Sequence, residues 1–350
     1  MKYFNDFAAS FSLGTTQVAH NMAVVPLFHP QTHDFTYLCL KDSLDKNLLE
    51  IKEVDQHGTV PTLIAINKGS APILILDGEE LAGGKQNRVL NTTILLKGKS
   101  QTTIPVSCTE SGRWHFISPK FADSGVTMMA TIRGRKARAV SANLQSKGRY
   151  ESNQGEIWES IDELSRQAAV NSPSSAMKDV IEQKRIHLKE YLEAFSWEKN
   201  QKGLLVIIND QVVGFDYISS EKVLKKLYTK LIESYALEAY FHPVRSKRKA
   251  KDKASSKEAS PKKESPKEKS AKEDTYHHQA AEFLNLVKNT PSRRFPSPGQ
   301  GWDYRFQQDN LVGSALYWRK KIIHTAFFHL PSQRSTSPLA GPRERSRYRL

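Results

Sequence analysis

Glycines, charged groups and amides are concentrated in one part of the chain, between Asp77 and Trp114. They lie in two stretches, DGEELAGGKQNRVLN and PVSCTESGRW, beside short apolar runs. Gly83 and Gly84 permit a ligand to approach the backbone closely, and the cations and amides that follow them supply charge and hydrogen-bond donors. This composition predicts a loop that binds an anion. The candidate ligand contacts are Glu79, Lys85, Gln86, Asn87 and Arg88, joined from the second stretch by Arg113 and Trp114.

A structural role for the same loop is the competing interpretation. Arg88 has three acidic residues close to it in sequence or in the neighbouring stretch, Glu79, Glu80 and Glu110. Ion pairs between such residues also occur in networks that only hold a fold together, so clustered charge does not by itself define a functional site. An internal salt-bridge network therefore stays open as an alternative.

Two standard phosphate-binding motifs are excluded, because residues that each of them requires are missing. A phosphate loop requires G-x-x-x-x-G-K followed by a hydroxyl residue that holds magnesium. Gly84 displaces Lys85 by one position here, and Gln86 stands where the hydroxyl belongs. A dinucleotide-binding G-x-G-x-x-G turn is absent as well, since the glycines at 299 and 301 lack the third glycine.

Glu110 is the candidate acid/base residue of this region. If Thr103 to Glu110 is a strand, Ile104, Val106 and Cys108 share one face with Glu110 by the two-residue period. Burial at the end of this apolar row is expected to raise the pKa of the Glu110 carboxyl, which suits proton transfer. A structural salt bridge from Glu110 to Arg113 is the alternative.

Cys108 is a second reactive group in the same row. As a nucleophile it needs a base such as His115 or His324 within reach. A free cysteine more often behaves as a small buried hydrophobe, and that interpretation is preferred.

Metal ligation is a third chemistry to weigh. Asp77, Glu79 and Glu80 could hold a hard cation, but no histidine lies at helical or H-x-H spacing with them and the EF-hand pattern is missing. We assign no metal ligand, and the sequence identifies no cofactor.

Strands are expected to position these residues. Residues 14–120 read as a β-rich segment in which glycines punctuate short apolar runs. Proline at position 26 suggests that the first run is an edge or terminal strand. The expected strands are Val18 to Phe28, Tyr37 to Leu40, Leu48 to Val54, Thr62 to Asn67, Ile73 to Leu76, Asn91 to Leu96 and Thr103 to Glu110.

Helices and hairpins follow in residues 150–242. Apolar positions at helical spacing predict one helix from Glu156 and a longer one over Ala176 to Phe195. Asn209-Asp210 favours a tight hairpin between Gly203 to Ile208 and Gln211 to Tyr217. Ser219 or Ser220 is expected to cap the next helix.

The final ordered part is expected over residues 276–330. It begins with a helix over Ala280 to Val287, continues with a strand around Tyr304 to Phe306, and ends in a hairpin from Leu311 to Phe328. Because so short a hairpin is unstable alone, we expect this segment to complete the earlier core. The prediction is an α+β fold in which residues 8–330 form one domain.

The net charge of +15 does not describe the folded part. Residues 245–274 carry a net charge of +6 and residues 331–350 carry +4, which leaves +5 for the other 300 residues. Both segments are expected to be disordered, because they have too few apolar groups to offset the entropy of ordering. No aromatic residue interleaves the basic ones in 246–275, so nucleic-acid binding is expected to be weak at most, through the basic insert and tail.

Composition also bears on the compartment. Two cysteines form no disulfide framework. Asp6 interrupts any apolar core of a signal peptide, and no run of 18 apolar residues exists to span a membrane. A cytoplasmic protein is the expectation, or a nuclear one if the basic cluster at 245–251 is a targeting signal.

Five segments in order carry a resemblance to a known family. They read DGEELAGGKQNRVLN, IPVSCTESGRW, GLLVIINDQVVGFDY, KLIESYALEA and GQGWDYRFQQDNLVGSALYWRKKIIHTAFF. Over residues 8–330 the chain resembles the ARG-and-rhodanese-phosphatase-superfamily-associated protein domain family, named for its association with ADP-ribosylglycohydrolases and phosphatases. The charged insert and basic tail depart from the family pattern.

The resemblance implies a link to the metabolism of NAD-derived ADP-ribose through association alone. An ADP-ribose-type ligand would need pyrophosphate partners such as Lys85, Arg88 or Arg113, and an aromatic such as Trp114 or Trp302 for its base. The alternative is that both tryptophans lie in the core. Two hypotheses follow: the domain binds or processes a nucleotide-type small molecule, or it is a non-catalytic binding or scaffolding module.

Overall fold

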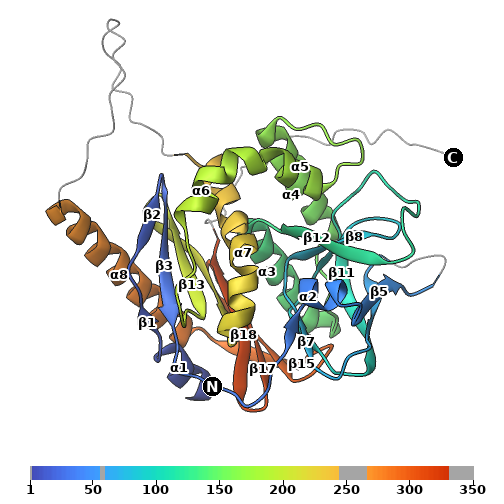
Figure 1. The fold of residues 1–350 in the computed structure, drawn as a ribbon, viewed down its shortest axis with the longest axis horizontal. Coiled ribbons are helices and arrows are strands. Elements are labelled where there is room, and N and C mark those ends of the chain that lie inside the picture. The colour runs from blue at the N-terminus through green and yellow to red at the C-terminus, as the bar shows by residue number, and fades with distance from the viewer. Residues whose placement is uncertain (1, 56–59, 244–265, 331–350) are drawn as a thin grey trace, which may run out of the picture.

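One large antiparallel sheet joins the two ends of the chain. The computed structural model describes residues 2–55, 60–243 and 266–330. Nine strands follow the order β1-β3-β13-β14-β18-β17-β16-β15, with β2 paired to β3 (Figure 1). They are β1 (Ser12–Leu13), β2 (Gln17–Ala19), β3 (Met22–Phe28), β13 (Gly203–Ile208), β14 (Gln211–Ile218), β15 (Ser292–Pro296), β16 (Trp302–Gln308), β17 (Leu311–Trp318) and β18 (Lys321–His329). Since β13 pairs with β3 and β14 with β18, the C-terminal segment completes the core begun at the N-terminus, as predicted.

Helices cover both faces of this sheet. Successive side chains of β3 point to opposite faces, so Val24 lies in one core while Val25 and Leu27 lie in the other. Helices α1 (Lys2–Ala8) and α8 (Pro266–Asn289) pack on the face of Val25, and α3 (Ala130–Lys147) and α7 (Glu221–Phe241) pack on the face of Val24 (Figure 1).

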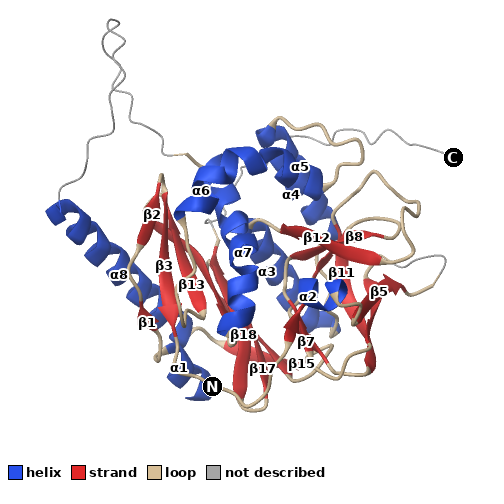
Figure 2. Cartoon of the chain, viewed as in Figure 1, coloured by secondary structure: helices blue, strands red, loops and turns tan. Residues whose placement is uncertain are grey.

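Two smaller sheets lie on the far side of α3 and α7 from the large sheet (Figure 2). A third core, made of aliphatic side chains and Phe121, lies within these two smaller sheets. One has three strands, β4 (Leu38–Cys39), β7 (Ile73–Ile75) and β10 (Ile94–Leu96). The other has six, β5 (Leu49–Glu53), β6 (Thr62–Asn67), β8 (Glu79–Gly83), β9 (Arg88–Leu90), β11 (Ser100–Cys108) and β12 (Phe121–Thr127). The polar stretches of the sequence lie in this six-stranded sheet.

Several local predictions are confirmed. The β13–β14 hairpin turns at Asn209 and Asp210, which have positive φ values of 50° and 60°. Ser220 caps α7 by accepting a hydrogen bond from the backbone N–H of Val223. The hairpin predicted for Leu311 to Phe328 is the pair β17–β18.

Two expected elements are divided. The run Val18 to Phe28 is a hairpin, β2–β3, because the chain turns at His20, where φ is 52°. The helix expected over Ala176 to Phe195 is α5 (Met177–Lys184), the 3-10 turn Arg185–Leu188 and α6 (Lys189–Ala194).

The strand that contains Pro26 is internal, since β3 lies between β1 and β13, which corrects the prediction of an edge or terminal strand. The carbonyl of Pro26 accepts from Gly14 on the β1 side of β3, so the missing N–H faces the same way. Neither β1 nor β2 pairs with Pro26 in the ladder, and proline is tolerated there because no ladder hydrogen bond is lost.

Helix α3 was not expected from the sequence, and neither were α1, the short α2 (Leu40–Asp45) or β15. The helix predicted from Glu156 is α4 (Gln154–Ala168). The helix predicted at Ala280 to Val287 begins earlier, at Pro266, so residues 266–274 of the predicted disordered insert are helical.

Residues 245–265 and 331–350 lie outside the described residues. Within the described ranges, no helix combines the length and apolarity needed to cross a bilayer.

Candidate functional site

The turn between β8 and β9 brings most of the predicted site residues together. Gly83 and Gly84 have φ values of 133° and 52°, a backbone shape that glycine adopts without strain. A Cβ on Gly83 would lie 2.6 Å from the hydroxyl of Ser118, and one on Gly84 would lie 2.3 Å from the ring of Phe121. These glycines therefore admit other parts of this chain, Ser118 to Phe121 and Glu53, rather than a ligand.

Arg113 and Glu110 form the centre of a buried hydrogen-bonded group, which we call the Glu110 cluster: Gln86, Asn87, Glu110, Arg113 and Ser174. Arg113 donates to Glu110 Oε2 at 2.5 Å, to the carbonyl of Gly84 at 2.8 Å and to Asn87 Oδ1 at 3.2 Å. Glu110 accepts further bonds from Ser174 Oγ at 2.6 Å and from the backbone N–H of Asn87 at 3.0 Å. Gln86 donates to the carbonyl of Glu110. Every charged group in this cluster has short-range partners.

The pKa of Glu110 is lowered, which corrects the expectation that burial raises it. Burial does oppose ionisation of the Glu110 carboxyl, but hydrogen bonds from Arg113, Ser174 and Asn87 outweigh that effect. The carboxyl is therefore held ionised, whereas a general acid at neutral pH needs a raised pKa.

Cys108 is a buried structural thiol. Its sulfur donates to the carbonyl of Glu110 at 3.2 Å and accepts from the same residue's N–H at 3.4 Å. Burial raises the pKa of the thiol. His324 serves a separate buried network and His115 is exposed, so the sequence preference for a buried hydrophobe agrees with the geometry.

Arg88 is buried as completely as any residue, yet it is poorly paired. Its exposed fraction is 0%, and it donates one hydrogen bond, from Nη1 to Gln86 Oε1 at 2.9 Å. Its nearest carboxylate, Glu53, lies 3.9 Å from Nη2. Nε and Nη2 have no hydrogen-bond partner among the described residues. Burial lowers the pKa of the Arg88 guanidinium, as expected for a cation that is not fully compensated.

Exposed aromatic rings lie next to Arg88. The Trp114 ring centroid is 5.8 Å from the guanidinium of Arg88 and 5.3 Å from the ammonium of Lys85, which is also 5.1 Å from the ring of Phe116. Trp114 is 49% exposed and Phe116 46% exposed. Trp302 is exposed as well, so the alternative that both tryptophans lie in the core is wrong.

A cleft of about 600 Å³ opens beside these rings. It is lined by Glu53 and its neighbours at the end of β5 and by Phe116 and the residues that follow it. Glu53 Oε1 accepts from the backbone N–H of Lys85 at 3.3 Å, whereas Glu53 Oε2 is buried and has no partner among the described residues. We call Glu53, Lys85, Arg88, Trp114 and Phe116 the Arg88 site.

Glu79 and Glu80 point away from the Arg88 site. Glu79 accepts from Lys230 Nζ of α7 at 2.8 Å and from the backbone N–H of Leu76 at 2.9 Å. Glu80 accepts from the Thr109 hydroxyl at 2.6 Å, and burial raises its pKa to about 7. Neither carboxylate forms the expected ion pair with Arg88.

Sequence reasoning missed a second buried charge network, centred on α3. Arg133 Nη1 and Nη2 bind the two carboxylate oxygens of Asp216 at 3.0 and 2.7 Å, and Lys136 binds Asp77. Thr93 connects the two ion pairs: its hydroxyl accepts from the backbone N–H of Asp77 and contacts Nδ1 of His324, whose Nε2 lies 3.5 Å from Asp216 Oδ1. We call this group the Arg133 network. The sequence did not indicate the roles of Arg133 and Lys136, because each pairs with a residue more than 50 positions away.

Glu53 and Ser174 were also missed at the site. They lie 32 and 64 positions from the residues that they contact, so no local spacing could indicate them. In residues 2–55, 60–243 and 266–330, no three histidine, cysteine or acidic side chains gather as a metal site.

Comparison with known proteins identifies one relationship. The family model described as the ARG and Rhodanese-Phosphatase-superfamily-associated Protein domain matches residues 10–328. No curated protein and no solved structure matches this chain.

Proposed function

Because the chain belongs to the ARG and Rhodanese-Phosphatase-superfamily-associated Protein domain family, we propose that its Arg88 site binds an ADP-ribose-type or related nucleotide. The family description names an association with ARG and with a phosphatase superfamily, which directs attention to ligands of this class. The side chains of the Arg88 site supply the remaining support for this proposal.

The observation that carries the proposal is the pairing of Arg88. An uncompensated charge in a protein interior is costly, so buried guanidinium groups normally have close acceptors. Arg88 has two nitrogens without a partner in the described part of the chain. An anionic group that reached Nε and Nη2 would bind both in the forked geometry that suits phosphate.

A nucleotide supplies the other groups that the Arg88 site can bind. The unpartnered Glu53 Oε2 accepts hydrogen bonds, which a ribose hydroxyl donates. Trp114 and Phe116 offer exposed ring faces on which a base can stack. Lys85, close to both rings, adds positive charge for a second phosphate. The adjoining cleft of about 600 Å³ has a volume typical of small-molecule sites.

The Glu110 cluster favours binding over proton-transfer chemistry. Arg113 is satisfied by acceptors of this chain, so it has little left to offer a phosphate. Glu110, with its lowered pKa, holds Arg113 and the turn at Asn87 in place. We assign to this cluster the structural role that the sequence left open, and to the Arg88 site the ligand.

Trp114→Ala tests the proposal with little risk to the fold, because the ring is half exposed. Thermal shift and isothermal titration calorimetry against ADP-ribose, NAD, ADP and inorganic phosphate should show stabilisation of the wild-type protein by at least ADP-ribose. Loss of the stacking ring should weaken that binding by about tenfold or more.

Trp302→Ala is the matched control, since it removes a tryptophan that is 39% exposed on β16. It should leave ADP-ribose affinity unchanged. The proposal fails if none of the nucleotides stabilises the wild-type protein, or if the two tryptophan variants weaken binding equally.

A further inference from the structure

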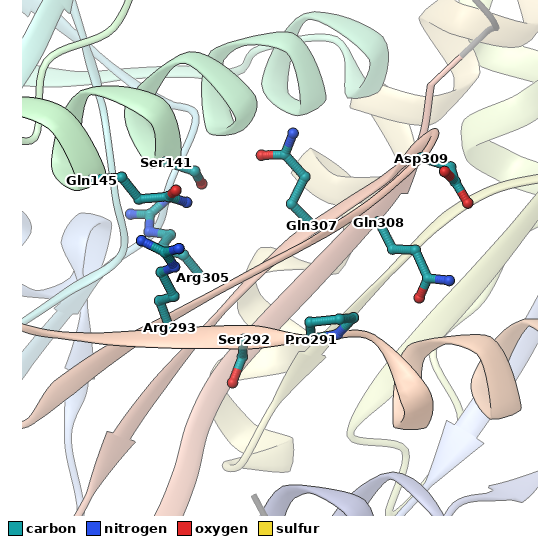
Figure 3. Close-up of a pocket in the computed structure, with 9 residues that line it drawn as sticks. All are labelled: Ser141, Gln145, Pro291, Ser292, Arg293, Arg305, Gln307, Gln308 and Asp309. Atoms are coloured by element: carbon teal, nitrogen blue, oxygen red, sulfur yellow. The ribbon is translucent and has the colours of Figure 1, made fainter.

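A second cavity, of about 440 Å³, lies between α3 and the outer strands of the large sheet. Its walls come from α3, from β15 and from β16 with the turn that follows (Figure 3). The lining side chains are nearly all polar. They are Ser141, Gln145, Ser292, Arg293, Arg305, Gln307, Gln308 and Asp309, together with Pro291.

Two arginines stand directly opposite each other in this cavity. Arg293 on β15 and Arg305 on β16 are cross-strand partners. Figure 3 shows their guanidinium groups gathered with the amide of Gln145 at one end of the cavity, while the Asp309 carboxylate lies at the other end. Like charges opposed across a strand pair are destabilising. Asp303 compensates the charge of Arg305 alone, so an anion between the two arginines would lower that cost further.

The protein fixes one of these arginines firmly in place. Arg305 is 3% exposed, and its Nε and Nη2 both donate to Asp303 Oδ2, at 2.9 and 2.6 Å. Asp303 is anchored in turn by the hydroxyl of Thr92 at 2.9 Å. Of the two arginines, only Arg305 has a carboxylate partner among the residues the structure describes. These bonds leave Nη1 of Arg305 without a hydrogen bond in the described part of the chain, so a fixed Nη1 beside the exposed guanidinium of Arg293 is suited to binding a phosphate.

We propose that this cavity binds a phosphorylated sugar-like molecule. Arg293 and Arg305 hold the phosphate, and the amides of Gln145 and Gln307 bind hydroxyl groups of the remainder, because amides both donate and accept hydrogen bonds. This binding is independent of the nucleotide at the Arg88 site, since the two sites share no residue.

Ribose 5-phosphate is the probe, compared with ribose and inorganic phosphate in buffers of equal ionic strength. Calorimetry and thermal shift should show binding of ribose 5-phosphate by the wild-type protein, weaker binding of inorganic phosphate and none of ribose. Arg293→Gln should raise the dissociation constant for ribose 5-phosphate about tenfold, because a charge-assisted hydrogen bond is lost.

Arg294→Gln is the matched control, since it removes the same charge from the next residue of β15, whose guanidinium lies over Trp302. Successive strand residues face opposite ways, so this variant should bind ribose 5-phosphate like the wild-type protein. Gln145→Ala should weaken ribose 5-phosphate more than inorganic phosphate.

The proposal is overturned if ribose 5-phosphate does not bind the wild-type protein. Equal losses in Arg293→Gln and Arg294→Gln also overturn it, because they would indicate attraction by net charge alone. If inorganic phosphate binds as tightly as ribose 5-phosphate, the sugar part of the proposal is wrong.

Discussion

Arg88 and Arg133 are equally buried, but they are paired in opposite ways. Both have exposed fractions of 0%. Arg133 binds Asp216 through two nitrogens at 3.0 and 2.7 Å, whereas the nearest carboxylate to Arg88 is 3.9 Å away. The pKa of Arg133 is raised, since attraction to Asp216 outweighs its burial, and the pKa of Arg88 is lowered because burial dominates.

This difference separates a structural charge from one suited to a ligand. In the Arg133 network, Nε of Arg133 and Nε2 of His324 lack a hydrogen-bond partner among the described residues, and the hydroxyl of Tyr235 also donates to Asp216. The network lies between the large sheet and the small ones, where its bonds fix how they meet. The Arg88 site lies beside a cleft and exposed rings, and two nitrogens of its guanidinium have no hydrogen-bond partner among the described residues.

The largest expected effect tests whether Arg133 stabilises the fold. Arg133→Met leaves Asp216 as a buried carboxylate without its main partner, and such losses cost about 3–5 kcal/mol. Urea unfolding at pH 7 should therefore show a lower free energy of unfolding by that amount. Adding Asp216→Asn to this variant should recover part of the loss, since the uncompensated charge is removed. A change below about 1 kcal/mol in the single variant would mean that the network does not stabilise the fold.

The next effect tests whether incomplete pairing extends beyond Arg88 to Glu80. Glu80 Oε2 is buried without a partner in the described residues, and the pKa of the carboxyl is raised from 4.5 to about 7. The folded protein therefore retains a proton that the unfolded chain loses above pH 4.5. The contribution of this proton to stability is complete below pH 4.5 and is lost as the pH rises through 7.

Glu80→Gln removes that titration. Relative to the wild-type protein, the variant should gain stability between pH 5 and pH 8 by about 3 kcal/mol, because burial raises the pKa of the Glu80 carboxyl to about 7. Urea unfolding at four pH values in this range measures the difference. Glu159→Gln, on an exposed position of α4, should keep the wild-type slope. Parallel stability curves for wild type and Glu80→Gln would show that the carboxyl is ionised throughout.

The same comparison explains which parts of the molecule the sequence could predict. The β13–β14 turn and the cap at Ser220 depend on residues within three positions of each other, and both are confirmed. Helix α3 was missed because Arg133 and Lys136 lie on its buried face, where a periodicity argument expects apolar residues. Their burial makes sense only with Asp216 and Asp77, which other elements supply.

In the candidate site, too, the sequence predicts features that depend on nearby residues and misses those that depend on distant ones. The sequence predicted that the two polar stretches gather around Arg88 and Glu110, but it did not predict the hydrogen bonds from Gln86 and Asn87 to Glu110. The sequence also could not predict that Glu53 is the carboxylate nearest to Arg88, because Glu53 belongs to another strand. The sequence could place the charges in one region, but the degree to which each charge is satisfied is set by long-range packing.

The smallest expected change in stability tests whether Arg88 serves a ligand and not the fold. Arg88→Met keeps the length of the side chain and removes a buried charge that has one hydrogen bond and a distant carboxylate. The lost bond to Gln86 and the relief of desolvation offset each other, so the free energy of unfolding should change by less than about 1 kcal/mol. ADP-ribose binding, measured by calorimetry, should fall at least about tenfold because the forked contact with phosphate is gone. A variant that unfolds like Arg133→Met would place Arg88 among the structural charges, and a folded variant that binds ADP-ribose normally would move the ligand elsewhere.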